Sequence, residues 1–191
     1  MNETAIRLKE LFLSSGLSKE VTAGLLGNIE IESNFKPLKE SLKYSSVARI
    51  RAVFPSKVKG MTDAQVQKLV MNEEALGNVV YKELGGYNFR GRGFIQITGK
   101  SNYEKFGKLI GLDLIKNPEL ACDEMIAGKI AVAYIKEVAI KKYPNLNNNT
   151  NAIEVFDIVT KSIQGFGKNY SSGFLLDHLI KKRTASKKYL W

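Results

Sequence analysis

Apolar residues recur at the spacing of an α-helix along most of the chain, and a single glycine-rich stretch breaks this pattern. The predicted helices cover 5–13, 18–33, 45–54, 62–70, 101–111, 123–140, 152–163 and 174–188. The interruption is "ELGGYNFRGRGFIQITGKSNY" at 83–103, in which "FIQIT" at 94–98 has β propensity. The sequence therefore predicts a mostly α-helical fold with a small β element.

Several predicted helices begin with residues that can cap their free N–H groups. The expected N-terminal caps are Ser18, Ser45, and the capping boxes Thr62/Gln65 and Ser101/Glu104. The Asn-rich segment at 145–151 is expected to be a surface loop. Because no segment reads as a domain linker, the 191 residues are expected to form one domain over 1–191. We also expect a monomer.

The chain has 29 basic and 19 acidic residues, a formal net charge of +10, which predicts an anionic partner. Nucleic acid, anionic lipid and the bacterial cell wall all satisfy this requirement, and an ordinary solvated basic surface is the alternative. No nucleic-acid-binding motif is recognised. The basic tail "LIKKRTASKKYLW" could contribute to such a surface. Neither a signal peptide nor a segment able to span a bilayer is evident, so stable membrane insertion is not expected.

One histidine and one cysteine make a His/Cys metal site or a histidine-dependent triad implausible. His178 lies in a helical pattern and is expected to be a surface or packing residue. Acid–base chemistry would then depend on carboxylates, without a metal or cofactor.

Two glutamates stand two residues apart in "GNIEIESNF" at 27–35. At about 100° per residue, Glu32 falls on the apolar stripe of its helix, whereas Glu30 falls on the opposite face. We therefore expect Glu30 in solvent and Glu32 partly buried, with a raised pKa suited to a general acid. The alternative is an ion pair between Glu32 and an arginine such as Arg49 or Arg92. Glu40 follows in a loop beside basic residues, where it would stay ionised.

Glycosidases use two carboxyl groups in opposed environments. The stretch "YNFRGRGFIQITGKSNYEKFGKLIGLDLIKNPEL" at 87–120 resembles the signature region of glycoside hydrolase family 19. That family comprises chitinases and the chitinase-like endolysins with which phages cut peptidoglycan. Its upstream segments resemble "ESNFKPLKESLKYSSVARIRAVFP" at 32–55 and "NEEALGNVVYKELGG" at 72–86.

The resemblance implies that Glu32 is the general acid and Glu40 the second carboxylate, with Thr98 holding the attacking water. An inverting reaction of this kind needs carboxyl groups about 6.5–9.5 Å apart. The substrate-binding positions that it implies are Tyr44, Gln96, Asn102, Tyr103, Gln164 and Arg183. Ile31 replaces the family's histidine, Gln164 replaces an asparagine, and one residue is missing before Glu40.

The segment "AGLLGNIEIESNF" at 23–35 also resembles the acid-bearing helix of phage lysozyme-type muramidases. Both resemblances imply a lysozyme-like α+β fold with the acid at Glu32. The function that they imply is an endolysin that hydrolyses the β-1,4 MurNAc–GlcNAc glycan of peptidoglycan, without a separate cell-wall-binding domain. It would accumulate in the host cytoplasm and reach the wall at lysis. The alternatives are a chitinase and a non-catalytic glycan-binding relative.

Overall fold

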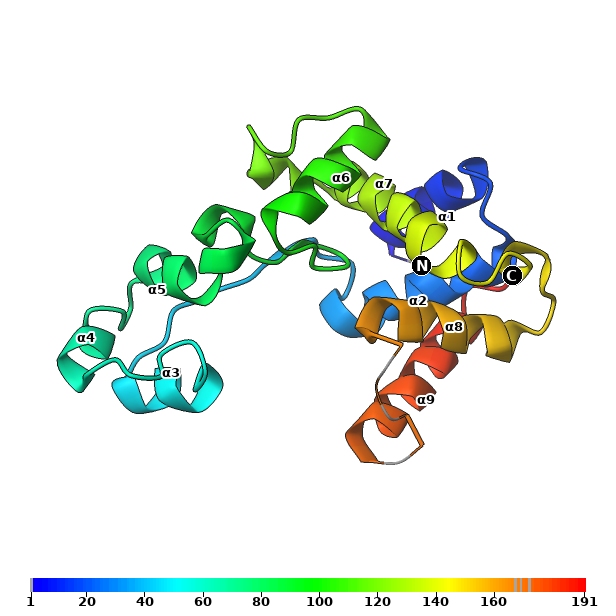
Figure 1. The fold of residues 1–191 in the computed structure, drawn as a ribbon. Helices are drawn as coiled ribbons and strands as arrows, with labels where there is room; N and C mark the ends of the chain where they lie inside the picture. The colour runs from blue at the N-terminus through cyan, green and yellow to red at the C-terminus, as the bar shows by residue number, and fades with distance from the viewer. Residues whose placement is uncertain (1, 167, 169, 172) are drawn as a thin grey trace. The chain divides into compact units, whose positions relative to one another are not determined.

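The computed structural model describes residues 2–166, 168, 170–171 and 173–191 (Figure 1). The helices are α1 Glu3–Ser14, α2 Lys19–Ser33, α3 Val47–Val53, α4 Asp63–Gln67, α5 Glu73–Val80, α6 Lys100–Ile110, α7 Glu124–Tyr134, α8 Ala152–Gln164 and α9 Gly173–Lys187. A π-helical turn at Ile135–Ile140 follows α7. The strands β1 Leu38–Lys39 and β2 Arg92–Gly93 pair in one two-stranded sheet. This confirms the predicted mostly α-helical fold with a small β element.

The chain divides into two compact units, each built from separate segments. The first unit contains 1–37, 93–95 and 121–191, and the second contains 38–92 and 96–120. The chain thus passes from one unit to the other four times. The expectation of a single catalytic domain over 1–191 stays a prediction.

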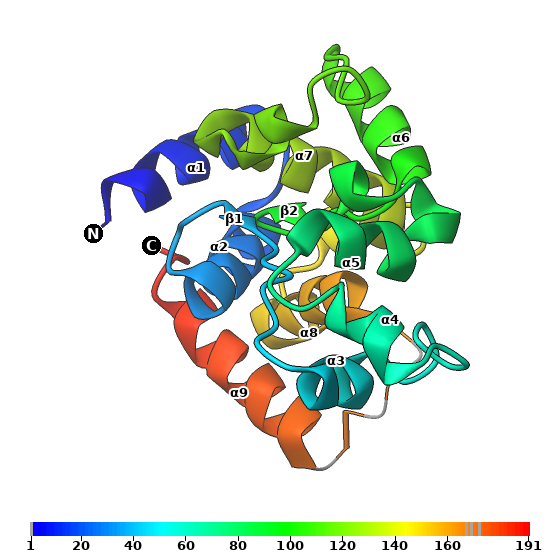
Figure 2. The ribbon, with the colours of Figure 1, turned by 90° about the vertical axis from the view of Figure 1, so that its left-hand side faces the viewer.

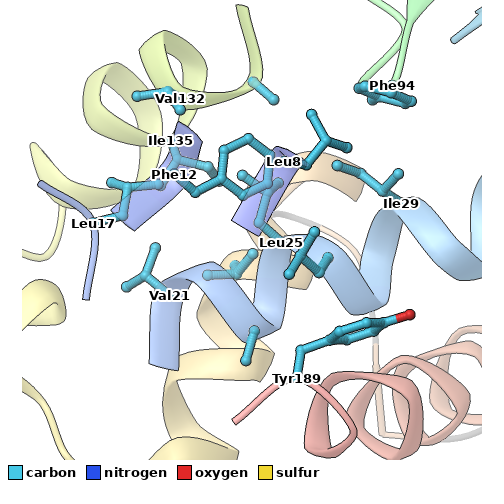
Figure 3. Close-up of a cluster of buried hydrophobic side chains, with 14 of the residues drawn as sticks. Leu8, Phe12, Leu17, Val21, Leu25, Ile29, Phe94, Val132, Ile135 and Tyr189 are labelled. Carbon is cyan, nitrogen blue, oxygen red and sulfur yellow. The ribbon is translucent and has the colours of Figure 1, made fainter. Parts of the chain in front are cut away.

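Helix α2 is the centre of the first unit: α1, α8 and α9 pack against it, and α7 packs on α1 (Figures 1 and 2). Every residue at 21–29 is buried, including two glycines and Asn28. A helix that is enclosed on all sides has no single apolar stripe. The surrounding core includes side chains from α1, α7 and α8, together with Phe94 and with Tyr189, which follows α9 (Figure 3). The labelled members of this cluster are Leu8, Phe12, Leu17, Val21, Leu25, Ile29, Phe94, Val132, Ile135 and Tyr189.

Two of the predicted N-terminal caps are confirmed. The Ser18 side chain accepts a hydrogen bond from the Val21 N–H, and Thr62 with Gln65 forms the complete capping box. The cap of α3 is Ser46 rather than Ser45, because the Ser46 hydroxyl is the group that accepts from Arg49.

The capping box predicted at Ser101 and Glu104 is wrong. Helix α6 already begins at Lys100, where Gly99 is the N-cap residue and provides no side chain. Ser101 therefore lies inside the helix, and Glu104 pairs instead with Lys108, 2.7 Å away on the next turn.

The second unit has its own apolar core beneath α3, α4 and α5. Its sheet is shifted from the predicted position, since β2 precedes "FIQIT" (Figure 2). Arg92 and Ile97 exchange both backbone hydrogen bonds, at 3.2 and 3.0 Å, so the chain reverses tightly between them. Gln96 has a φ of +53° within this turn, which a continuous strand does not allow.

Among the helices that the structure describes, none combines the length and apolarity needed to cross a bilayer.

Candidate active site

Glu32 lies in the last turn of α2, where its carboxylate meets side chains from α8 and α9. Lys182 Nζ lies 2.5 Å from Glu32 Oε1. The Gln164 amide donates to the same oxygen over a longer distance of 3.4 Å. Glu32 therefore forms an ion pair, as the alternative predicted, but its partner is Lys182 and neither Arg49 nor Arg92.

The predicted environments of the two glutamates on α2 are wrong. The Glu32 side chain is 41% exposed, whereas the Glu30 side chain is only 23% exposed. Glu30 is no free surface charge, since it pairs with Lys188 at 2.9 Å and accepts a hydrogen bond from the Tyr189 hydroxyl. Because α2 is buried on all sides before Glu30, its helical phase could not identify the solvent face.

The expected raised pKa of Glu32 is also corrected. Burial alone would raise the pKa, but Lys182, Gln164 and His178 stabilise the carboxylate more strongly, and the pKa of Glu32 is lowered. His178 had been expected only to pack or to face solvent. Its ring lies against Phe174, with centroids 4.2 Å apart, and close enough to Glu32 to act on its charge.

Arg183 occupies a different position from Lys182 although the two residues are adjacent. Its guanidinium forms a bidentate ion pair with Asp157, with both contacts at 2.5 Å. Arg183 also lines a pocket of about 390 Å³ together with Lys161 and Tyr170. Its partner in the structure is thus an aspartate on α8.

In the second unit, Glu40 follows β1 and is held by a tyrosine that sequence reasoning had missed. The Tyr81 hydroxyl lies 2.7 Å from both Glu40 oxygens, and the Gly91 N–H donates to Oε2 at 3.2 Å. The backbone of Glu40 is also fixed, because its N–H donates to the Gly91 carbonyl at 2.9 Å. Burial, followed by the Glu40 charge, raises the pKa of Tyr81, so its hydroxyl remains a donor.

Gln96 and Thr98 lie close to Gly91. A Cβ at position 91 would meet Gln96 Oε1 at 2.7 Å and Thr98 Oγ1 at 3.5 Å, so a larger residue there would displace the Gln96 amide. The Gln96 amide donates to the Leu38 carbonyl, and the Thr98 hydroxyl donates to the Gln96 carbonyl. The structure therefore brings Glu40, Gln96 and Thr98 together around one glycine.

Two further predicted substrate-binding residues lie in the second unit. Asn102 is exposed in the first turn of α6, and its amide donates to the Thr98 carbonyl at 2.8 Å. Tyr44 is half-buried and packs edge-on against Phe54, with ring centroids 5.3 Å apart. Both are placed where part of the side chain stays accessible.

Tyr103 is different, because its side chain is fully buried. Its hydroxyl donates to the Arg90 carbonyl and accepts from Arg92, which itself pairs with Glu119 at 2.6 Å. A ring in this position cannot stack on a sugar, so its observed role is to hold buried Arg92.

Replacing Tyr81 by Phe is expected to lower kcat about 10- to 100-fold, with little change in KM. The change leaves the ring in place but removes the donor that orients both oxygens of Glu40. Steady-state kinetics on soluble glycan would measure the effect. Tyr143→Phe removes an exposed hydroxyl elsewhere and serves as the control. An unchanged kcat in Tyr81→Phe would show that this hydrogen bond does not position Glu40.

Comparison with known proteins finds a family match for the segment that contains Tyr81, Gly91, Gln96 and Thr98. Residues 74–152 match the glycoside hydrolase family 19 model, described as chitinase class I. A glycosyl hydrolase family 19 domain-containing protein of Haemophilus influenzae is 36% identical over 108 residues, which is 53% of this chain and 54% of that protein. The acidic 27 kDa endochitinase of Solanum lycopersicum is 50% identical over 48 residues, 25% of this chain and 19% of that protein.

The fold is also similar to the crystal structure of a chitinase C mutant, with a TM-score of 0.54 and 20% identity. That alignment covers 90% of this chain and 72% of the other. At 20% identity this similarity shows the fold of the chain, and the sequence similarity is carried by the matched segments. Residues 74–152 are thus similar to glycoside hydrolase family 19, of the chitinase class I type. The chain spans about half the length of the Haemophilus protein and about a fifth of the tomato protein.

Proposed function

We propose that this chain is a glycosidase that cleaves the glycan strands of bacterial peptidoglycan. The observation that carries the proposal is the cluster around Gly91, where Glu40 is fixed by two donors and the Thr98 hydroxyl lies close to the same glycine. A carboxylate that is held still beside a hydroxyl can accept a proton from a water that the hydroxyl orients.

In the proposed reaction, Glu32 gives its proton to the glycosidic oxygen as the bond between that oxygen and C1 breaks. Water adds to C1 from the opposite face, and its proton passes to Glu40. Thr98 orients this water, and the configuration at C1 is inverted. One bond to the leaving oxygen is thus exchanged for one bond to water. Every proton is accounted for by the two carboxyl groups.

Peptidoglycan is favoured as the substrate because the net charge of +10 suits the anionic bacterial wall. Adsorption to the wall should therefore weaken as salt increases. The proposed bond is the β-1,4 link between MurNAc and GlcNAc, and the proposed setting is lysis of the host by a phage endolysin acting as a monomer. Chitin is the second candidate substrate, because several relatives are named endochitinases.

Purified peptidoglycan and chitin, incubated separately with the protein, would test the proposal. We expect soluble fragments from peptidoglycan, and mass spectrometry after reduction should identify MurNAc as the new reducing end. GlcNAc at the new reducing end would show that the protein cuts the other glycosidic bond of the strand. Release from chitin alone would refute the proposed substrate. Binding to either polymer without any release would identify a non-catalytic glycan-binding protein.

A further inference from the structure

Lys182 is a lysine whose side chain is fully buried. Taking an ammonium group out of water is costly unless an opposite charge compensates for it. Its ionic partner is Glu32, and among the described residues Nζ makes no other polar contact. The proposed general acid, Glu32, is therefore in direct contact with a buried cation.

The packing of α9 on α2 fixes this position. Gly27 and Ser186 are in such close contact that a Cβ on Gly27 would lie 2.5 Å from the Ser186 backbone nitrogen. The Ser186 hydroxyl donates to the Lys182 carbonyl at 2.7 Å, one turn earlier on α9. The close packing of the two helices thus fixes the position of the Lys182 ammonium relative to the Glu32 carboxylate.

Lys182 approaches only one of the two Glu32 oxygens. Both Lys182 Nζ and Gln164 Nε2 contact Oε1, while no donor to Oε2 is found in the described part of the chain. Since an ammonium can only donate, Oε1 must act as an acceptor while Lys182 is charged. A proton bound to Glu32 is therefore directed to Oε2.

The charges that act on this pair come from a small group of residues. Lys182 and His178 on α9 stabilise the Glu32 carboxylate, and Lys168 repels Lys182. Glu30, the nearest acid on α2, is already paired with Lys188. The pKa of Lys182 is lowered by burial although Glu32 opposes this shift, and the pKa of Glu32 is lowered in turn.

We propose that Lys182 is a positioning residue for the general acid: it holds Oε1 of Glu32, so that Oε2 carries the acidic proton and presents it to the glycan. The inference rests on the proposed function, in which Glu32 is the acid. It also gives Lys182 control over the pH range of the reaction. A fixed positive charge favours the carboxylate, so the protonated acid is lost at a lower pH than it would be without Lys182.

Lys182→Met tests the proposal, because it keeps the length of the side chain and removes both the charge and the donor. Replacing a buried ion by an apolar residue is often tolerated. We expect the alkaline limb of kcat to move to higher pH, and kcat on the acidic side to fall about 10- to 100-fold. The titration of the Glu32 carboxyl carbon, followed by ¹³C NMR and assigned with Glu32→Gln, should move upward with that limb.

Lys182→Arg retains a cationic donor and should restore the alkaline limb toward that of the wild type. Lys181→Met is the matched control, since it removes the same charge from the exposed neighbouring residue and should leave the profile unchanged. If Lys182→Met does not fold, Lys182→Gln provides the same test of charge.

An unchanged Glu32 titration in folded Lys182→Met would overturn the inference. An equal shift in Lys181→Met would also overturn it, because the effect would then arise from net charge. Wild-type protein without glycosidase activity would instead refute the proposed function. The titration would still report whether Lys182 controls Glu32, so the two failures are distinguishable.

Discussion

Replacing Glu32 by Gln is expected to lower kcat on peptidoglycan by about 10²- to 10⁴-fold. Glutamine has nearly the same shape and can still accept a hydrogen bond from Lys182 through its carbonyl oxygen. It cannot donate a proton to the leaving oxygen, so the loss would report the acid step. The rate of clearing of a cell-wall suspension, together with the release of reducing ends, would measure the effect.

Glu30→Gln is the matched control for this experiment. It makes the same substitution two residues earlier on α2, at a carboxylate whose contacts are Lys188 and Tyr189. Its activity should stay within a few-fold of wild type. Circular dichroism should confirm that both variants are folded. A Glu32→Gln protein that clears cell walls at the wild-type rate would remove Glu32 from the proposed mechanism.

The second large effect is expected at Gly27, where α2 and α9 are closest. In Gly27→Ala the new Cβ would lie 2.3 Å from the Ser186 hydroxyl oxygen and 2.7 Å from its Cα. Backbone atoms cannot move aside as a flexible side chain can, so the helices must separate. Overpacking of this kind lowers the free energy of unfolding by about 1–3 kcal/mol or more. The thermal midpoint should fall by about 2–4 °C for each kcal/mol.

Gly24→Ala is the matched control on the same helix. Its Cβ would meet only the Phe156 and Val159 side chains, at 3.3 and 3.4 Å, which can shift by a few tenths of an ångström. Alanine also favours the helical state over glycine by about 0.5–1 kcal/mol. We therefore expect Gly24→Ala to stay close to wild type. Equal thermal midpoints for the two variants would contradict the proposed close packing at Gly27.

Features that depend on neighbouring residues could be predicted from the sequence. Ser18 caps α2 as expected because its hydroxyl reaches an N–H three residues later. The capping box of Thr62 and Gln65 is equally local. The failure at Ser101 has a local cause as well, since Gly99 begins the helix earlier than the box motif indicated. The turn that replaces the predicted "FIQIT" strand depends on pairing between Arg92 and Ile97, which propensity alone does not specify.

The predicted site residues divide in a similar way. The resemblance to family 19 indicated Glu40, Gln96 and Thr98, and the structure brings these three together around Gly91. Tyr81 was missed because a tyrosine at the end of a helical segment has no sequence signal that connects it to a glutamate 41 positions earlier. Tyr103 was expected at the substrate, but its side chain is fully buried and contacts Arg90 and Arg92.

By itself, the sequence determined where most helices begin and end, the excess of positive charge, and the carboxylates that could support glycoside hydrolysis. These properties follow from local hydrogen bonding, composition and residue type. Only the tertiary structure decided which of two glutamates on α2 meets a buried cation, and which of two adjacent lysines provides it. Lys181 and Lys182 are chemically identical, and they differ only because α9 packs on α2 with one of them inside. That packing gives Glu32 its charge environment.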